Sequence, residues 1–342
     1  MRARPLLLVA AALLVTVSVT ASCSQPVSSD NTGESITGAG QSSLSPITLI
    51  AEPLYGSPSK LRDLSVATEL PASGSVMVYK VRHPKVDKDN VREVAKRLGL
   101  GSAEVGETDD FLFARNASGD VHVDKVSGAL YYDTPALDGS PRPLQDVRDE
   151  DYYRTEAEKF LKGTGLWREG AVFAGLSTET MTKTEGAGKE ATYPLSVEVH
   201  FTSGALGGLP WAGVGPKISV FFGEGARVTG AAVYWPQVDE YKKYPTISGQ
   251  QAIDNILAGK GGIMEADPAE DKGIIQQVEM VYWCDPVGYP QEFVAPYYRM
   301  RGVTAGGSDF TVYTRAIPEE LITETRPPSP ASAATVTPRT GD

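Results

Sequence analysis

The residue types that most often carry chemistry are few and scattered in this chain of 342 residues. The three histidines, His83, His122 and His200, each stand alone. A HExxH pair or a Cys/His cluster would bring metal ligands together, and the sequence contains neither. We therefore expect no transition-metal site and no cofactor. His200 lies in an alternating apolar–polar run, which predicts a place on the polar face of a strand.

Motifs for nucleophilic catalysis are also missing from the sequence. It has no GxSxG elbow and no phosphate-binding P-loop. One SxxK string runs from Ser57 to Lys60, but Pro58 disfavours the helix that must carry such a pair. We interpret this string as a chance match in a loop.

The glycine-rich stretch Gly204–Gly215 invites comparison with cofactor-binding loops. It lacks the GxGxxG spacing, and no helix start follows it, whereas a cofactor phosphate needs both. A long hairpin loop or a bulged strand is the simpler interpretation. In the alternative, Leu209, Pro210 and Trp211 expose an apolar surface to a ligand or partner.

Carboxylates occur in dense groups at Asp109-Asp110 and Asp149-Glu150-Asp151. A glycosidase needs two carboxylates that flank one scissile bond. Adjacent residues on a strand point to opposite faces, and acids at a helix start interact favourably with the helix dipole. Both groups therefore have structural explanations. An envelope hydrolase whose carboxylates are assembled only by the fold remains the alternative function.

Aromatic residues concentrate in the second half of the chain. Tyr and Trp suit interfaces because they bury area and keep a polar tip, and they are equally typical of strand-rich cores. Both interpretations stay open. If the chain has a binding surface, we expect it at Trp211, Tyr282, Tyr297 and Tyr298.

The N-terminus predicts where the protein resides. Arg2 and Arg4 precede an apolar run from Leu6 to Val19, which is short for a membrane span. The sequence Val-Thr-Ala-Ser then leads into Cys23, and small residues before a cysteine resemble the lipobox of bacterial lipoproteins. The resemblance implies cleavage before Cys23, diacylation of its thiol and attachment to the extracytoplasmic face of the cell membrane. A plain secretory signal cut near Ala21 is the alternative.

Cys284 is the only other cysteine. If Cys23 is acylated, an intramolecular disulfide is excluded, so the fold depends on its core. We expect the Cys284 thiol to be buried and unreactive.

The composition describes a globular, acidic protein. Hydrophobic residues make up 41% and charged residues 22%, and the formal net charge is -11. Binding to nucleic acid requires concentrated Lys and Arg, so the charge argues against a nucleic-acid partner. It argues equally against electrostatic adhesion to anionic lipid.

Changes in composition predict the domain organisation. Residues 1–22 form the expected signal peptide, 23–45 a flexible Ser/Gly-rich tether, and 326–342 a disordered tail. Between them we expect three units, at 46–148, 149–245 and 246–325.

The units are predicted from a recurring order of helix and strands. Helices are expected at Asp87–Leu98, Asp151–Lys162 and Gly249–Ala258, and strand-rich segments follow each one. A hairpin is expected from Lys217–Phe222 and Arg227–Trp235, with glycines at its turn. The pattern predicts an α+β fold of repeated short helices and antiparallel sheets.

The third helix carries a family resemblance. Ile247-Ser248-x-x-x-Ala252, opening a short amphipathic helix before strands, resembles the start of PepSY domains. The layout as a whole is similar to extracytoplasmic accessory regulators of sensor histidine kinases. The resemblance implies a non-catalytic binding or regulatory module, with an envelope protein as its partner.

The anchor gives the first testable prediction. Because the thiol of Cys23 is the expected acylation site, Cys23→Ala should release the protein into the medium or leave an unprocessed precursor. Mass spectrometry of the mature N-terminus checks this. A wild-type N-terminus at another residue, without an acyl mass, would contradict the lipoprotein hypothesis.

Overall fold

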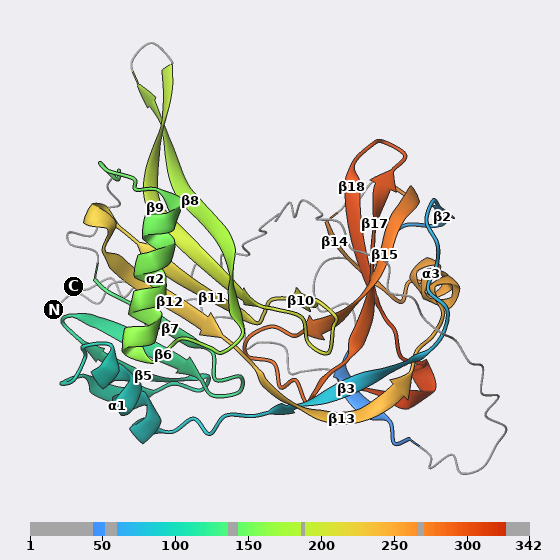
Figure 1. Ribbon diagram of the computed structural model, residues 1–342, viewed down its shortest axis with the longest axis horizontal. Coiled ribbons are helices and arrows are strands. Elements are labelled where there is room, and N and C mark those ends of the chain that lie inside the picture. Colours follow the sequence, from blue (N-terminus) through green and yellow to red (C-terminus); the bar gives the residue numbers. More distant parts are fainter. Residues whose placement is uncertain (1–43, 52–59, 136–142, 186–188, 266–269, 326–342) are drawn as a thin grey trace, which may run out of the picture. The chain divides into compact units, whose positions relative to one another are not determined.

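The computed structural model describes residues 44–51, 60–135, 143–185, 189–265 and 270–325 (Figure 1). The expected signal peptide, Cys23, the tether up to residue 43 and the C-terminal tail lie outside the described residues. Leu44–Thr325 form one compact unit.

Two helices begin at acidic caps. In α1 (Lys88–Arg97) the Asp87 carboxylate accepts hydrogen bonds from the backbone N–H groups of Asp89 and Asn90. In α2 (Glu150–Thr164) the carboxylate of Asp149 caps the backbone in the same way. The two predicted helices are confirmed, and α2 extends slightly beyond both expected ends.

The third helix is also confirmed. In α3 (Gly249–Leu257) the Ser248 hydroxyl accepts from the backbone N–H of Gln251, and the Gln251 side chain accepts from the backbone N–H of Ser248. This is the capping box that the sequence indicates. Within the described part of the chain, no helix has the length and apolar composition to span a membrane.

Eight strands form one antiparallel sheet, in which every neighbouring pair runs in opposite directions. In spatial order the strands are β4 (Glu104–Glu107), β5 (Phe111–Asn116), β6 (Gly119–Asp124), β7 (Leu130–Asp133), β12 (Val228–Tyr234), β11 (Lys217–Phe222), β9 (Lys189–Ser203) and β8 (Ala171–Glu185).

The helices α1 and α2 pack on one face of this sheet (Figure 1). Alternate residues of the strands point to that face, and their apolar side chains join those of the helices in one core. Tyr153 and Leu161 of α2 and Phe201 of β9 are fully buried there.

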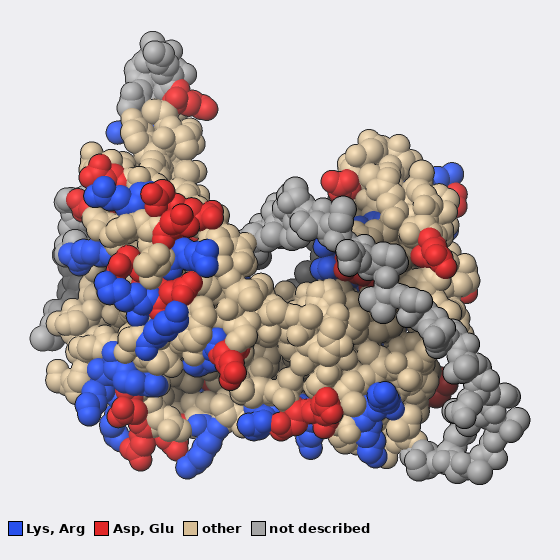
Figure 2. All heavy atoms as spheres, in the orientation of Figure 1, with Lys and Arg blue, Asp and Glu red and all other residues tan. Residues whose placement is uncertain are grey.

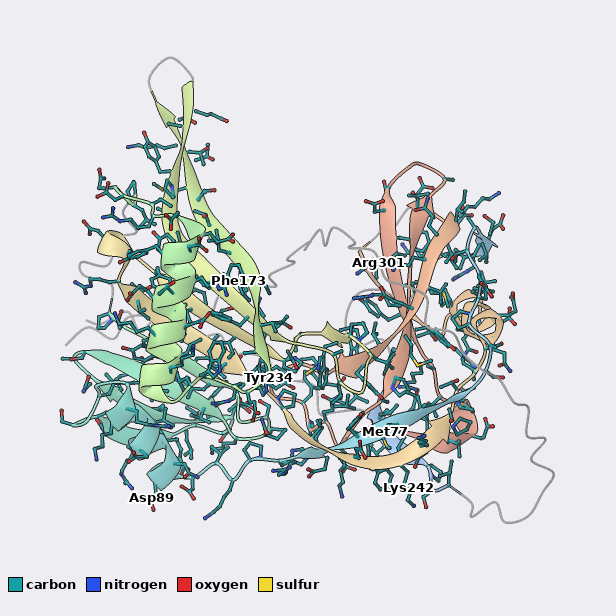
Figure 3. The ribbon with its side chains drawn as sticks, in the orientation of Figure 1. Met77, Asp89, Phe173, Tyr234, Lys242 and Arg301 are labelled. Carbon is teal, nitrogen blue, oxygen red and sulfur yellow. The ribbon has the colours of Figure 1, made fainter. Side chains whose placement is uncertain are left out.

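The predicted β11–β12 hairpin is confirmed. The neighbouring β8–β9 hairpin is long, because each of its strands has 15 residues. Its distal part extends beyond the other strands, with side chains on both faces (Figures 1 and 3).

A second sheet is built around the long strand β15 (Lys272–Cys284). On one edge β15 pairs antiparallel with β17 (Pro296–Thr304), which is followed by β18 (Asp309–Arg315) and β14 (Gly262–Glu265). On the other edge it pairs in parallel with β2 (Asp63–Val66) and β10 (Trp211–Gly213). Helix α3 contacts β18 and β2, and its buried Ile253 and Ile256 lie in the core of this sheet.

Two small sheets complete the fold. β3 (Ser75–Arg82) pairs with β13 (Gln237–Pro245) and β16 (Phe293–Val294). β1 (Ile47–Ile50) pairs in parallel with β19 (Ile322–Thr325). The remaining regular elements are the short 3-10 helices Glu224–Ala226 and Glu319–Leu321.

The predicted fold class is wrong. The described chain is mostly sheet, and it does not repeat a helix-plus-sheet unit. The eight-stranded sheet takes strands from both 46–148 and 149–245, and β15 pairs with strands that come from each of these ranges. The physical reason is that capping is local, whereas strand pairing is decided by contacts distant in sequence. The PepSY-like motif at Ser248 therefore indicates a helix start and nothing larger.

Helix α3 supplies a stability prediction. Ile256 is fully buried, so Ile256→Ala should lower the free energy of unfolding by about 2–5 kcal/mol, and Ile256→Asp should lower it further. Asp254→Ala, on the exposed face of the same helix, should change it by less than about 0.5 kcal/mol. Urea unfolding measures all three. Equal stability of Ile256→Asp and wild type would show that α3 does not pack on this sheet.

Candidate functional site

The candidate site is the outer edge of β15, between the two short strands that dock there. Gly213 in β10 aligns with Cys284, and Val66 in β2 aligns with Ile275. On this edge, between β2 and β10, no described strand pairs with the residues from Gln276 to Val281, whose other edge pairs with β17. We call this interval the strand gap.

Hydrogen bonds at both ends show which residues of β15 face outward. The Tyr282 N–H donates to the carbonyl of Pro210, at 2.9 Å, and the Ile275 carbonyl accepts from the Ala67 N–H, at 2.8 Å. Both groups therefore point away from β17. Outward-facing residues alternate along an antiparallel strand, so the N–H and C=O groups of Val278 and Met280 also point outward.

A β-bulge explains why an odd-numbered residue faces outward at the β2 end of the strand gap and an even-numbered residue at the β10 end. The register with β17 shifts between Ile275 and Gln277, so Gln276 is an extra residue. Outward-facing residues have odd numbers before the bulge and even numbers after it. The strand gap thus presents two N–H and two C=O groups that bond no described residue.

One face of the strand gap is apolar. Val278 and Met280 are half-buried and pack against the core under α3. Leu64 and Leu70 pack against the same core.

The opposite face carries three charged side chains. Arg299 of β17 places both Nε and Nη2 2.8 Å from Oε1 of Glu279. Arg301, labelled in Figure 3, places Nη1 3.6 Å from the same oxygen. The Arg301 side chain is 47% exposed and the Arg299 side chain 15%, so Arg301 is the more accessible cation.

The four aromatic residues named from the sequence lie beside the strand gap, mostly in the core. Tyr282, Tyr297 and Tyr298 are 1%, 6% and 0% exposed. The Tyr282 hydroxyl donates to the Met77 carbonyl at 2.6 Å, and the Tyr298 hydroxyl donates to the Ile247 carbonyl at 2.8 Å. Their burial matches the core alternative, so the candidate site does not use their side chains.

Trp211 lies in β10, aligned with Tyr282, and is partly buried. The bend before it contains Leu206 and Leu209, which pack with Trp211 against Tyr282 and Tyr79. The glycine-rich stretch therefore attaches this part of the chain to β15. Leu209 and Trp211 are partly buried against the protein's own core, whereas Pro210 is exposed.

Beyond Trp283, the end of β15 is buried. Cys284 is fully buried, which confirms that prediction, and burial raises the pKa of its thiol to about 12. Burial also raises the pKa of Asp285 to about 7, although a hydrogen bond with Trp283 and the charge of Arg315 act in the opposite direction. The adjoining cavity, about 10 Å³, has room for one water at most.

His200 lies in β9 on the face opposite the core residues Val197, Val199 and Phe201, which confirms the predicted polar face, although the residue is only 3% exposed. Its Nε2 is 3.0 Å from the Ser177 hydroxyl, its Nδ1 is 3.1 Å from the Ser219 hydroxyl, and Glu198 lies 3.6 Å from Nδ1. Seryl hydroxyls from two neighbouring strands satisfy the ring, which allows a polar side chain to be buried in the sheet.

The Ser177–His200 pair invites comparison with a catalytic triad. Burial, and secondarily the charge of Lys217, lower the pKa of His200 to about 4. A general base works best with a pKa near the working pH, so this imidazole is a poor one at neutral pH. We interpret the network as structural.

Two carboxylates face each other on neighbouring strands, Asp120 on β6 and Asp133 on β7. A hydrogen bond from His122 lowers the pKa of Asp120, with a further contribution from Arg115. A glycosidase needs its acids on either side of a cleft. Neither carboxylate lines the small cavity beside Asp285 or the hollow along α2. The described residues include no group of three or more His, Cys, Asp or Glu side chains placed to hold a metal ion.

A larger hollow, of about 520 Å³, lies along α2 and has a charged lining. Figure 2 shows acidic and basic side chains intermixed over this helix. They pair with one another, as Lys162 does with Glu158 at 2.7 Å and Lys159 with Glu156 at 3.2 Å. Binding pockets are mostly apolar, so we interpret this face as a solvated helix surface.

Comparisons with known proteins add little to this geometry. No family model matches the chain, and neither does any curated protein. Among solved structures, it is similar to an uncharacterized protein from Eubacterium rectale, with 9% identity and a TM-score of 0.38 over 73% of this chain and 87% of that one. It is also similar to YycH from Bacillus subtilis, with 10% identity and a TM-score of 0.41 over 70% of this chain and 52% of that one.

The sequence analysis missed the strand gap. Its functional groups are backbone N–H and C=O groups, which every residue except proline carries. The one available signal was the alternation of charged and apolar residues around Glu279 and from Arg299 to Arg301, which indicates a strand with one polar face.

The raised pKa of Asp285 predicts how stability depends on pH. The folded protein keeps this proton up to about pH 7, whereas the unfolded chain releases it near pH 4. The contribution of Asp285 to the free energy of unfolding is therefore fully present at low pH and is lost as pH rises from about 4 to about 7.

Asp285→Asn should remove this contribution. Urea unfolding of wild type at pH 5 and pH 8 should show a larger loss of stability at the higher pH than the variant shows. An identical pH dependence in the two proteins would contradict the assignment.

Proposed function

We propose that the protein is a non-catalytic binding protein of the cell envelope. A lipid on Cys23 holds it at the extracytoplasmic face of the membrane. It binds an extended segment of a protein partner, which adds as a strand to the gap in β15.

The observation that supports binding is the set of outward-facing backbone groups of Val278 and Met280 that bond no described residue. Exposed sheet edges are templates for another strand, and proteins use them to bind extended peptides. β2 and β10 already use the same edge, which shows that the edge accepts strands on both sides of the gap.

The size of the strand gap defines the segment. Six residues of a strand span roughly 20 Å, which suits an inserted segment of about four residues. Each backbone hydrogen bond contributes about 0.5–1.5 kcal/mol net. Four such bonds give weak binding, so side chains on both faces must add affinity.

The hydrogen bonds and ion pairs of the titratable side chains also support a binding role. His200 binds two hydroxyls, and Asp120 is held by His122 and Arg115. These side chains already serve the sheet. The N-terminal sequence supports the membrane location.

A proline substitution tests the proposal. Val278→Pro removes an outward-facing N–H and places a ring on the edge, and edge strands tolerate proline at such positions. Val278→Ala is the matched control, because it shortens the side chain and keeps the N–H. A photo-crosslinking residue at the exposed Gln277 reports on occupancy in the full-length protein in intact membranes.

We expect a discrete crosslinked product from the Val278→Ala protein and its loss from the Val278→Pro protein, with both proteins folded by circular dichroism. Equal crosslinking by the two variants, or none by the protein with Val278 intact, would contradict binding at the strand gap. Steady turnover of a peptide or glycan that a single carboxylate substitution abolishes would establish the hydrolase instead.

A further inference from the structure

The side chains at the strand gap define what kind of segment fits it. Successive residues of an inserted strand point to opposite faces of the sheet. Residues level with Val278 and Met280 point to the face that α3 covers. The residue between them, level with Glu279, points to the charged face.

The first face favours apolar side chains. Val278 and Met280 are half-buried, and Leu64 and Leu70 pack against the same core. Apolar side chains on an inserted strand would extend this core and remove apolar surface from water.

The second face favours an acidic side chain. Two arginines and one glutamate contact one another there, which leaves one positive charge in excess within this cluster. Arg299 is committed to Glu279 by two short contacts at 2.8 Å. Arg301 lies 3.6 Å from the same oxygen, beyond hydrogen-bond distance, and makes no other ion pair with a described residue.

Arg301 lies on β17, two strands from the gap, but its guanidinium already reaches over β15 to Glu279. Because a guanidinium has five N–H donors in a planar fork, it can bind a second carboxylate beside the first. A carboxylate on the inserted strand, level with Glu279, would be within its reach.

We propose that the partner segment carries an acidic residue flanked on each side by an apolar residue, and that Arg301 selects the acidic residue. This inference rests on the proposed function. It adds the chemical class of the partner and the residue that determines specificity.

The chain's own C-terminal segment fits this pattern poorly. Residues 326–342 contain four prolines, at positions 327, 328, 330 and 338, and Asp342 is their only acidic residue. Proline lacks the N–H that strand addition uses. The C-terminal segment is thus a poor occupant, and we take the occupant to be a segment of a separate protein.

Two fluorescent peptides test the inference. Each has Ser and Gly flanks, one around Val-Glu-Val and the other around Val-Lys-Val. They are titrated to millimolar concentration against the full-length lipidated protein in detergent, using wild type, Arg301→Gln and Arg301→Glu. We expect wild type to prefer the Glu peptide by about tenfold, Arg301→Gln to lose most of that preference, and Arg301→Glu to prefer the Lys peptide.

Added salt should weaken the preference of wild type, because the ion pair is partly exposed. Val278→Pro should abolish binding of the Glu peptide, which places the peptide in the strand gap. Equal binding of the two peptides to wild type, no binding of either, or an unchanged preference in Arg301→Glu would each overturn the inference.

The crosslinking experiment distinguishes a failure of the acidic selection by Arg301 from a failure of strand addition itself. A crosslink at Gln277 that is lost in Val278→Pro but kept in Arg301→Glu would leave strand addition intact and remove the acidic selection. A crosslink from Gln277 to residues 24–43 or 326–342 of the same chain would identify the protein itself as the occupant and overturn the proposed partner.

Discussion

The structure depends on the attachment of β10 to β15. The chain leaves the eight-stranded sheet after β9, pairs in parallel with the end of β15, and returns to the eight-stranded sheet as β11. Gly213 makes this possible. Its φ is 88°, and a Cβ at this position would collide with the carbonyl of Cys284, so only glycine allows so close an approach. The Tyr234 hydroxyl also donates to the Asp285 carbonyl at 3.0 Å, which adds a second link between β12 and the end of β15.

The helices could be predicted because their signals are local. Asp87, Asp149 and Ser248 each bind backbone N–H groups within three residues, so the caps are visible in the sequence. Strand partners have no such signal. β3 pairs with β13 about 160 residues later in the chain, and nothing in either segment specifies the other. The predicted repeat of helix-plus-sheet units was wrong for this reason, because strands from different expected units pair within the same sheet.

Strand length was also hard to predict. The distal part of β8 is rich in threonine and lacks the apolar alternation that marks a half-buried strand. It is exposed to solvent and pairs with β9 alone, so no core imposes a pattern on its side chains. In contrast, Val197, Val199 and Phe201 of β9 alternate with polar residues, and the sequence predicted that part of the strand correctly.

The candidate site escaped prediction because it consists of what the strands leave unpaired. Tyr282, Tyr297 and Tyr298 suggested an interface by residue type, but their hydroxyls and rings complete the core. Only the positions of β2 and β10 show that no described strand pairs with the outer edge of Val278 and Met280. Residue type alone carries no information on that point.

The bulge at Gln276 sets the phase of β15. Before it, odd-numbered residues face the outer edge, and after it, even-numbered residues do so. Loss of one residue between Ile275 and Tyr282 would turn every later side chain to the opposite face. Val281 and Trp283 would leave their core, and Glu279 would enter the core under α3. Substitutions in this interval are therefore tolerable in a way that insertions and deletions are not, so the interval of six residues between Ile275 and Tyr282 is itself a structural element.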